Sequence, residues 1–236
     1  MKWMALPKIN EVPKYFLEIP STDEKVAYRP FLTKEQKILL IAMESQDQNN
    51  ILNSITDIIQ ACMISDINIK QLTTFDVEYI FTQIRAKSVG ENSKIGMTCT
   101  ECQETNELNI NLAEIKVNKE NILSNIIKLN DTYTLKLKYP NYLFTLKATA
   151  DSFTENMLYL ISGCLDTLNT EEEQIAFRDE TDADIMDFID SLTTVQFEEI
   201  VIFVNAIPKL EHKVEFVCTK CQHENHGTLR GINDFF

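Results

Sequence analysis

KIGMTCTECQETN at residues 94–106 and KVEFVCTKCQHEN at residues 213–225 are two copies of one short unit. The copies align without a gap. They share a lysine, an aliphatic residue, a Met or Phe, the string Cys-Thr-x-Cys-Gln and a final asparagine. Because the matching residues extend beyond the cysteines, we interpret the pair as an internal repeat rather than as two accidental Cys-x-x-Cys pairs.

The spacing of the cysteines predicts a metal site. Two residues between thiolates let the chain turn tightly, so that both sulfurs reach one tetrahedral zinc ion at about 2.3 Å. Each unit supplies half a site, and the two halves make a closed, four-thiolate structural site with one Zn²⁺ per chain. The predicted ligands are Cys99, Cys102, Cys218 and Cys221. Alternating apolar residues before each pair indicate that each knuckle lies at the tip of a β-hairpin, as in a zinc ribbon.

Other uses of these cysteines remain open at the level of sequence. His223 and His226 offer a rival local site with the second pair, but the repeat aligns them with Glu104 and Glu107, so a histidine is not part of the repeated unit. A thioredoxin-like redox role lacks the required βαβ context. The pairs can also be ordinary reduced thiols that bind no metal.

The two halves lie more than a hundred residues apart, which predicts that the middle of the chain is inserted between them. Closing so long a loop costs only slightly more than closing a short one, because the entropy grows logarithmically with length. We expect four segments: an N-terminal hairpin and helices at 1–92, the first knuckle at 93–112, an inserted hairpin and helical region at 113–211, and the second knuckle and tail at 212–236.

Hydrophobic periodicity predicts an α+β fold that is dominated by helices, with short β-hairpins and a discontinuous zinc ribbon. Hairpins are expected over 15–31 and over 131–148, the second with a turn at Pro140-Asn141. Capping pairs at Thr33/Gln36, Ser152/Glu155 and Thr193/Gln196 predict helix starts. The expected helices cover 34–45, 50–62, 74–90, 152–168, 183–192 and 193–207.

Composition indicates a globular protein of 236 residues, with 44% hydrophobic residues, 5 Gly and 6 Pro. The formal charge of −14 opposes binding to nucleic acid. The start of the chain lacks the apolar core of a signal peptide, and the longest apolar run, Ile38 to Met43, is too short to span a membrane. We therefore expect no export by that route, no membrane insertion and no nucleic-acid partner.

The remaining cysteines and the acidic run have simpler interpretations. Cytosolic thiols stay reduced, so the six cysteines of a chain that is not exported do not predict disulfides. Cys62 and Cys164 fall within apolar helical patterns and are expected to be buried thiols. The acidic run at 171–187 has no EF-hand spacing, which favours a solvated loop and helix start over a calcium or magnesium site.

The sequence offers no pattern that is typical of an enzyme. A closed zinc site leaves no position for water or substrate. The chain also lacks G-x-S-x-G, P-loop, H-E-x-x-H and Rossmann glycine motifs. We expect a non-enzymatic protein with no small-molecule substrate.

The N-terminal third contains four characteristic segments: ALPKI at 5–9, IPST at 19–22, YRPFLTKEQKILLIAMES at 28–45 and TFDVEYIFTQIRAKSVGE at 74–91. Through these segments the chain resembles the baseplate hub assembly proteins of T4-like contractile-tailed bacteriophages, a family that the paired knuckles also fit. It implies a protein that binds the phage baseplate hub proteins, in the host cytoplasm during assembly or in the tail baseplate of the virion. It leaves open whether the chain assists assembly, like a chaperone, or stays in the hub.

Two further alternatives remain at this stage. A zinc-ribbon adaptor of a cellular complex is the second function hypothesis, and the acidic charge disfavours it. Tyr28, Arg29 and Phe31 either form the corner between a strand and the first helix or make a partner-binding patch, since these residue types are enriched at interface cores.

Overall fold

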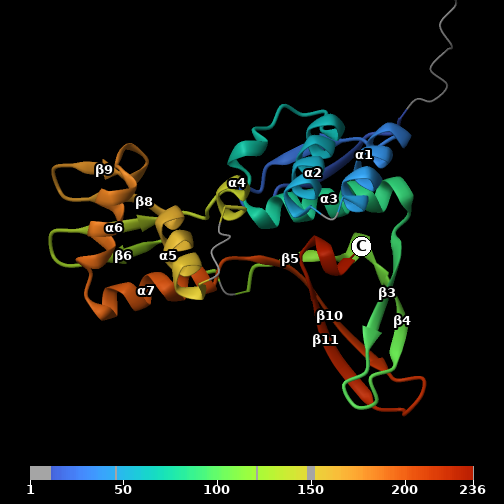
Figure 1. Ribbon diagram of the computed structural model, residues 1–236. Coiled ribbons are helices and arrows are strands. Elements are labelled where there is room, and N and C mark those ends of the chain that lie inside the picture. Colours follow the sequence, from blue (N-terminus) through green and yellow to red (C-terminus); the bar gives the residue numbers. More distant parts are fainter. Residues whose placement is uncertain (1–11, 46, 121, 148–151, 236) are drawn as a thin grey trace, which may run out of the picture.

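The computed structural model describes residues 12–45, 47–120, 122–147 and 152–235. Figure 1 shows three groups of elements: helices from the N-terminal part of the chain, a second group of helices around a small sheet, and a pair of long hairpins that project away from both. Each group has its own cluster of buried apolar side chains. The result is a mixed fold of helices and short antiparallel strands, as the sequence predicts.

The N-terminal group is a hairpin packed on three helices. Its strands β1 and β2 pair antiparallel, which confirms the predicted hairpin, and the core includes Val26, Ile59 and Phe81. The elements are β1 (Tyr15–Glu18), β2 (Lys25–Tyr28), α1 (Thr33–Glu44), α2 (Gln48–Cys62), the 3₁₀ turn η1 (Ile69–Gln71) and α3 (Thr74–Val89).

The projecting hairpins contain the repeated units. The first pairs β3 (Asn92–Thr98) with β4 (Thr105–Asn111), and the second pairs β10 (Lys209–Val217) with β11 (Glu224–Arg230). The two knuckles are therefore at hairpin tips, as predicted. At the base, the 3₁₀ turn η2 (Leu112–Glu114) leads into β5 (Lys116–Asn118), which adds a third strand beside β10.

The inserted group surrounds a four-stranded antiparallel sheet in the order β6-β7-β8-β9. Helices α5 and α7 pack on each other, and the core includes Leu135, Ile161 and Phe203. The elements are β6 (Ile126–Lys128), β7 (Thr134–Leu137), α4 (Tyr142–Thr145), α5 (Phe153–Cys164), β8 (Leu165–Asn169), β9 (Gln174–Ala176), the 3₁₀ turn η3 (Phe177–Asp179), α6 (Asp182–Asp190) and α7 (Thr194–Asn205).

The predicted hairpin over 131–148 is wrong in its second half. After β7, Pro140 and Asn141 lead into the short helix α4 instead of a turn between strands. The Asn141 side chain caps this helix, because its Oδ1 accepts a hydrogen bond from the Phe144 backbone N–H at 2.8 Å. Strand β7 pairs with β6 and β8, so its partners lie elsewhere in the chain.

Two helix boundaries also differ from expectation. Helix α5 ends at Cys164, and the residues predicted as its last turn form β8, which is held between β7 and β9. Helix α1 is capped by Glu35 rather than by Thr33, since Glu35 Oε2 accepts a hydrogen bond from the Leu32 backbone N–H at 2.8 Å. The predicted caps Ser152 and Thr193 are confirmed.

The third core joins the hairpins to the N-terminal helices. Ala86 of α3 packs there with Leu112, Leu210 and Phe235. Phe235 belongs to the 3₁₀ turn η4 (Ile232–Phe235) and is fully buried, and its carbonyl accepts a hydrogen bond from Ser93 Oγ at 3.1 Å. The last described residues of the chain therefore fasten the base of the first hairpin.

Cys62 and Cys164 are confirmed as buried thiols, and burial raises their pKa values to about 11 and about 12. The thiolate is the reactive form, so neither should react rapidly with a thiol reagent in the native protein. We expect Cys62→Ser and Cys164→Ser each to lower the free energy of unfolding by about 1–3 kcal/mol, the cost of a poorly satisfied buried hydroxyl. Chemical denaturation and native-state labelling check this, and rapid labelling at either position would contradict it.

Candidate metal centre

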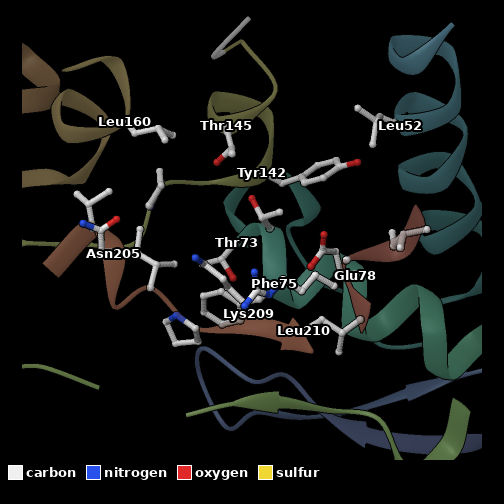
Figure 2. A pocket seen from close by; sticks show the side chains of 18 of the residues that line it. Leu52, Thr73, Phe75, Glu78, Tyr142, Thr145, Leu160, Asn205, Lys209 and Leu210 are labelled. Carbon is white, nitrogen blue, oxygen red and sulfur yellow. The ribbon is translucent and has the colours of Figure 1, made fainter. Parts of the chain in front are cut away.

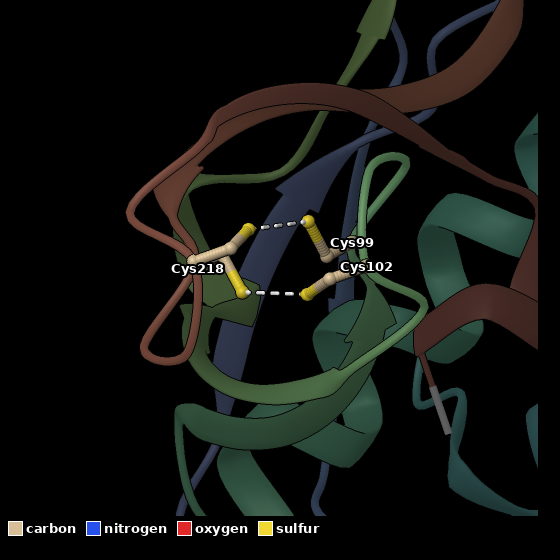
Figure 3. Close-up of side chains that lie close together, drawn as sticks. Cys99, Cys102 and Cys218 are labelled. Carbon is tan, nitrogen blue, oxygen red and sulfur yellow. Dashed lines mark hydrogen bonds between the residues drawn. The ribbon is translucent and has the colours of Figure 1, made fainter.

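The two hairpin tips meet and bring the four predicted cysteines into one cluster (Figure 3). Cys99 and Cys218, the first cysteine of each pair, are fully buried. Cys102 is partly buried and Cys221 is exposed. The cluster therefore has a closed side, formed by the first cysteines, and a more open side.

Both knuckles use the same backbone turn. The Cys99 N–H donates to the Glu104 carbonyl at 2.8 Å, and the Gln103 N–H donates to the Cys99 carbonyl at 3.1 Å. The second knuckle repeats these bonds at 2.9 and 3.0 Å. The repeated glutamines, Gln103 and Gln222, have φ values of 60° and 58°, the left-handed region that few non-glycine residues adopt. The sequence repeat is thus also a repeat of conformation.

The sulfur positions suit a tetrahedral metal ion. The Sγ atoms of Cys99 and Cys221 lie 3.6 Å apart, as do those of Cys102 and Cys218, and all four ligand atoms lie within 4.8 Å of one another. Four thiolates at the zinc–sulfur distance of about 2.3 Å would be separated by about 3.8 Å. The observed distances are far too long for disulfide bonds, which require about 2.05 Å.

The protein environment already favours ionisation of the first cysteine in each knuckle. The backbone N–H of Cys102 lowers the pKa of Cys99, and the backbone N–H of Cys221 lowers the pKa of Cys218 to about 6. The second cysteines also receive a backbone N–H, which lowers their pKa, but burial and the neighbouring thiols outweigh it and raise the pKa of Cys102 and Cys221. Four close sulfurs resist carrying four negative charges until a cation compensates them.

The histidines lie outside this cluster. His223 is exposed, and its backbone carbonyl accepts the hydrogen bond that closes the second knuckle. His226 Nδ1 lies 3.3 Å from Glu215 Oε1 on the exposed face of the hairpin. Among the described residues, the group of potential ligand atoms consists of the four cysteines alone.

Sequence reasoning did not assign a role to two buried asparagines, Asn106 and Asn225. They are the matching final residues of the two repeated units, so the repeat could have pointed to a shared role for them. Each side chain reaches the opposite knuckle.

The sequence-predicted partner residues lie in the N-terminal core. Tyr28 and Phe31 are buried. Arg29 donates to Glu35 Oε1 at 2.8 Å and to the Ala61 carbonyl at 2.7 Å, so it links the start of α1 to the end of α2. Their contact with a partner stays a prediction. Phe31 lines one hollow together with Leu40 and Met43 of α1.

A cavity of about 510 Å³ lies where the three groups of elements meet (Figure 2). Its walls come from α2 and α3, from the inserted group and from β10 and β11, and Tyr142, Glu78, Lys209 and Arg230 are among its polar residues. Within the described chain, the buried Tyr142 hydroxyl has no hydrogen-bond partner. Burial raises the pKa of Glu78 to about 7.

The geometry defines an α+β protein in which two hairpins, distant in sequence, meet at a four-cysteine cluster. The model of the family described as T4 bacteriophage base plate protein matches residues 12–236, and the chain belongs to this family. A search of curated proteins and a search of solved structures each found no match.

Family membership makes the chain a bacteriophage baseplate protein. This is consistent with a structural role, with partners among the other baseplate proteins and with a place in the virion tail. None of the described helices is both long enough and apolar enough to cross a membrane.

Glu78 gives a pH-dependent prediction. Its pKa is higher in the folded chain than in the unfolded chain, so its contribution to stability is complete below about pH 4.5 and is lost as the pH rises through about 7. Glu78→Gln removes this dependence, and we expect the variant to gain about 1–3 kcal/mol relative to wild type between pH 5 and pH 8. Denaturant unfolding across this range measures the difference. Glu198→Gln on the exposed face of α7 is the control, and parallel curves for Glu78→Gln and wild type would refute the prediction.

Proposed function

We propose that this baseplate protein is a non-enzymatic structural or assembly protein of the baseplate hub, stabilised by one structural zinc ion. The observation that carries the proposal is the convergence of four cysteines from two distant hairpins at one point. The assignment to the hub is supported by the resemblance of the segments at 5–9, 19–22, 28–45 and 74–91 to hub assembly proteins. Family membership supports a phage setting over a cellular adaptor.

Zinc suits the donor set because four thiolates fill all four positions of its preferred tetrahedron. When bound, the ion would neutralise the thiolate charges and tie the two hairpin tips together. Cys99 and Cys102 would hold it from the first hairpin, and Cys218 and Cys221 from the second. Such a site has no open coordination position, so it supports a structural role and not catalysis.

Helix α1 provides a surface for a hub partner. Among the described side chains of this helix, only Glu35 and Ala42 are buried, whereas Ile38, Leu40, Ile41 and Met43 are 45–68% exposed. A hollow of about 320 Å³ lies on each side of this apolar ridge. Exposed patches of large apolar side chains mark interaction sites in soluble proteins. We assign the ridge to contact with an apolar surface of another hub protein, because this family acts within an assembly.

The zinc proposal predicts the metal content. Elemental analysis of the purified protein should find one zinc per chain, and a strong chelator should lower the melting temperature because structural zinc contributes to folding. The double variant Cys99→Ser, Cys218→Ser should lose the metal, while His223→Ala and His226→Ala should keep it. A protein without zinc, or a double variant that retains it stoichiometrically, would contradict the site. If the analysis finds iron instead of zinc, the four predicted ligands stand and only the identity of the metal changes.

The hub proposal predicts a complex. Co-expression with the hub proteins of the same phage should yield a stable association that weakens with salt, since the charge of −14 favours partners with basic patches. Ile41→Glu should abolish the complex and leave the melting temperature unchanged, because Ile41 is 68% exposed. Val195→Glu on α7 is the matched control, with 67% exposure. Phe31→Ala should lower the melting temperature, because Phe31 is buried.

The possible outcomes separate the two parts of this proposal. If wild type forms a complex that Ile41→Glu retains, the α1 contact is wrong and the hub role stands. If wild type binds no hub protein, and a phage that lacks the gene still assembles complete hubs, the hub role itself is refuted.

A further inference from the structure

Asn225 connects the second knuckle to the first. Its side chain is 3% exposed, and its Oδ1 accepts hydrogen bonds from the Thr100 backbone N–H at 2.9 Å and from Thr100 Oγ1 at 3.0 Å. Its Nδ2 donates to the His223 carbonyl at 2.9 Å and to Cys99 Sγ at 3.5 Å. One amide therefore holds its own knuckle, the loop of the other knuckle and one of the predicted metal ligands.

Asn106 makes the reciprocal set of contacts. It is 4% exposed, and its Oδ1 accepts from the Thr219 backbone N–H and Thr219 Oγ1, both at 2.9 Å. Its Nδ2 donates to the Glu104 carbonyl at 3.0 Å and to Cys218 Sγ at 3.7 Å. The two asparagines thus cross between the hairpins in a twofold-like arrangement.

The orientation of both amides follows from chemistry. A backbone N–H can only donate, so the atom that faces each threonine must be the amide oxygen, which leaves the NH₂ group toward the carbonyl and the sulfur. Both donors and both lone pairs of each amide are then used, and a buried polar group is satisfied in full. No other residue type of this size offers two donors and two acceptors in that geometry.

We propose that Asn106 and Asn225 are positioning residues of the metal centre, each of which sets the first cysteine of the opposite knuckle for coordination. The inference rests on the proposed zinc site. A hydrogen bond to a charged acceptor is stronger than one between neutral groups, so the amide N–H stabilises Cys99 or Cys218 as the thiolate that a metal requires. Groups behind metal ligands orient them and tune their affinity in this way.

The crossed arrangement also makes each knuckle depend on the other. The threonine contacts do not involve the sulfurs, so they dock the two hairpin tips before any metal is bound. Preorganised ligands lose less conformational freedom on binding, which raises the affinity of the complete site. The open side of the cluster, with Cys102 and the exposed Cys221, receives no such amide contact among the described residues.

The test compares Asn106→Ala, Asn225→Ala and the double variant with wild type. Competition with a chromophoric chelator measures zinc affinity, the absorption spectrum of the Co²⁺-substituted protein reports thiolate geometry, and the melting temperature is recorded before and after chelation. Each single variant should lose about 10–100-fold in zinc affinity, as is typical for groups that support ligands, and should shift the cobalt spectrum. The melting temperature of the chelated protein should fall too, because the threonine contacts are independent of metal.

Four further variants keep the test interpretable. Asn109→Ala removes an exposed asparagine from the same strand, β4, and should leave every readout unchanged. Thr100→Val and Thr219→Val remove only one hydroxyl contact each and should weaken zinc binding by a few-fold. They provide the test if the alanine variants fail to fold. Asn106→Asp keeps the size but places a carboxylate oxygen against the sulfur and the carbonyl, so it should bind zinc at least as poorly as Asn106→Ala.

The outcomes distinguish this inference from the proposed zinc site. Wild type without metal affinity would refute the site and the positioning role together. Wild type that binds zinc, with asparagine variants of unchanged affinity and unchanged cobalt spectrum, would overturn the positioning role alone. A lower melting temperature with unchanged affinity and spectrum would have the same meaning, because it shows that the asparagines serve folding only.

Discussion

The meeting of two hairpin tips at four sulfur atoms is the constraint on which the rest of the chain depends. The Sγ atoms of Cys99 and Cys221 lie 3.6 Å apart, although the two residues belong to segments separated by more than a hundred residues. The chain between them must leave the first hairpin and return to the second, and much of it forms a body with its own sheet, β6-β7-β8-β9, and its own core. Closing this long loop carries a modest entropic cost, which grows only logarithmically with length.

The tips are held by polar contacts and the base of the hairpins by apolar ones. At the tips, the amides of Asn106 and Asn225 are saturated by hydrogen bonds, and this limits the cost of burying them. At the base, Leu112, Leu210 and Phe235 pack against α3. The hairpins are therefore fixed at both ends, as suits a structural part of a baseplate.

Apolar surface is distributed unevenly over the molecule. Most large apolar side chains of α2 and α3 face the N-terminal core, whereas α1 exposes Ile38, Leu40 and Ile41. Burying such side chains against a partner would be favourable by about 25 cal/mol per Å². Arg29 and Glu35 form a largely buried ion pair that holds the first turn of α1 in place. The exposed apolar side chains of α1 therefore lie on an anchored helix.

The repeat by itself predicted that the four cysteines belong together, that the knuckles lie at hairpin tips and that both knuckles turn alike. It could do so because a tight turn between two thiolates is a local property of the chain. The helix caps at Ser152 and Thr193 could also be predicted from the sequence, because a cap bonds to a residue only three positions further along. Tertiary structure alone decided that Asn141 starts a helix, that Leu165–Asn169 is a strand between β7 and β9, and that Asn106 and Asn225 cross between knuckles. Short apolar runs suit helix or strand equally, and the choice depends on which distant segments bury them and complete their hydrogen bonds.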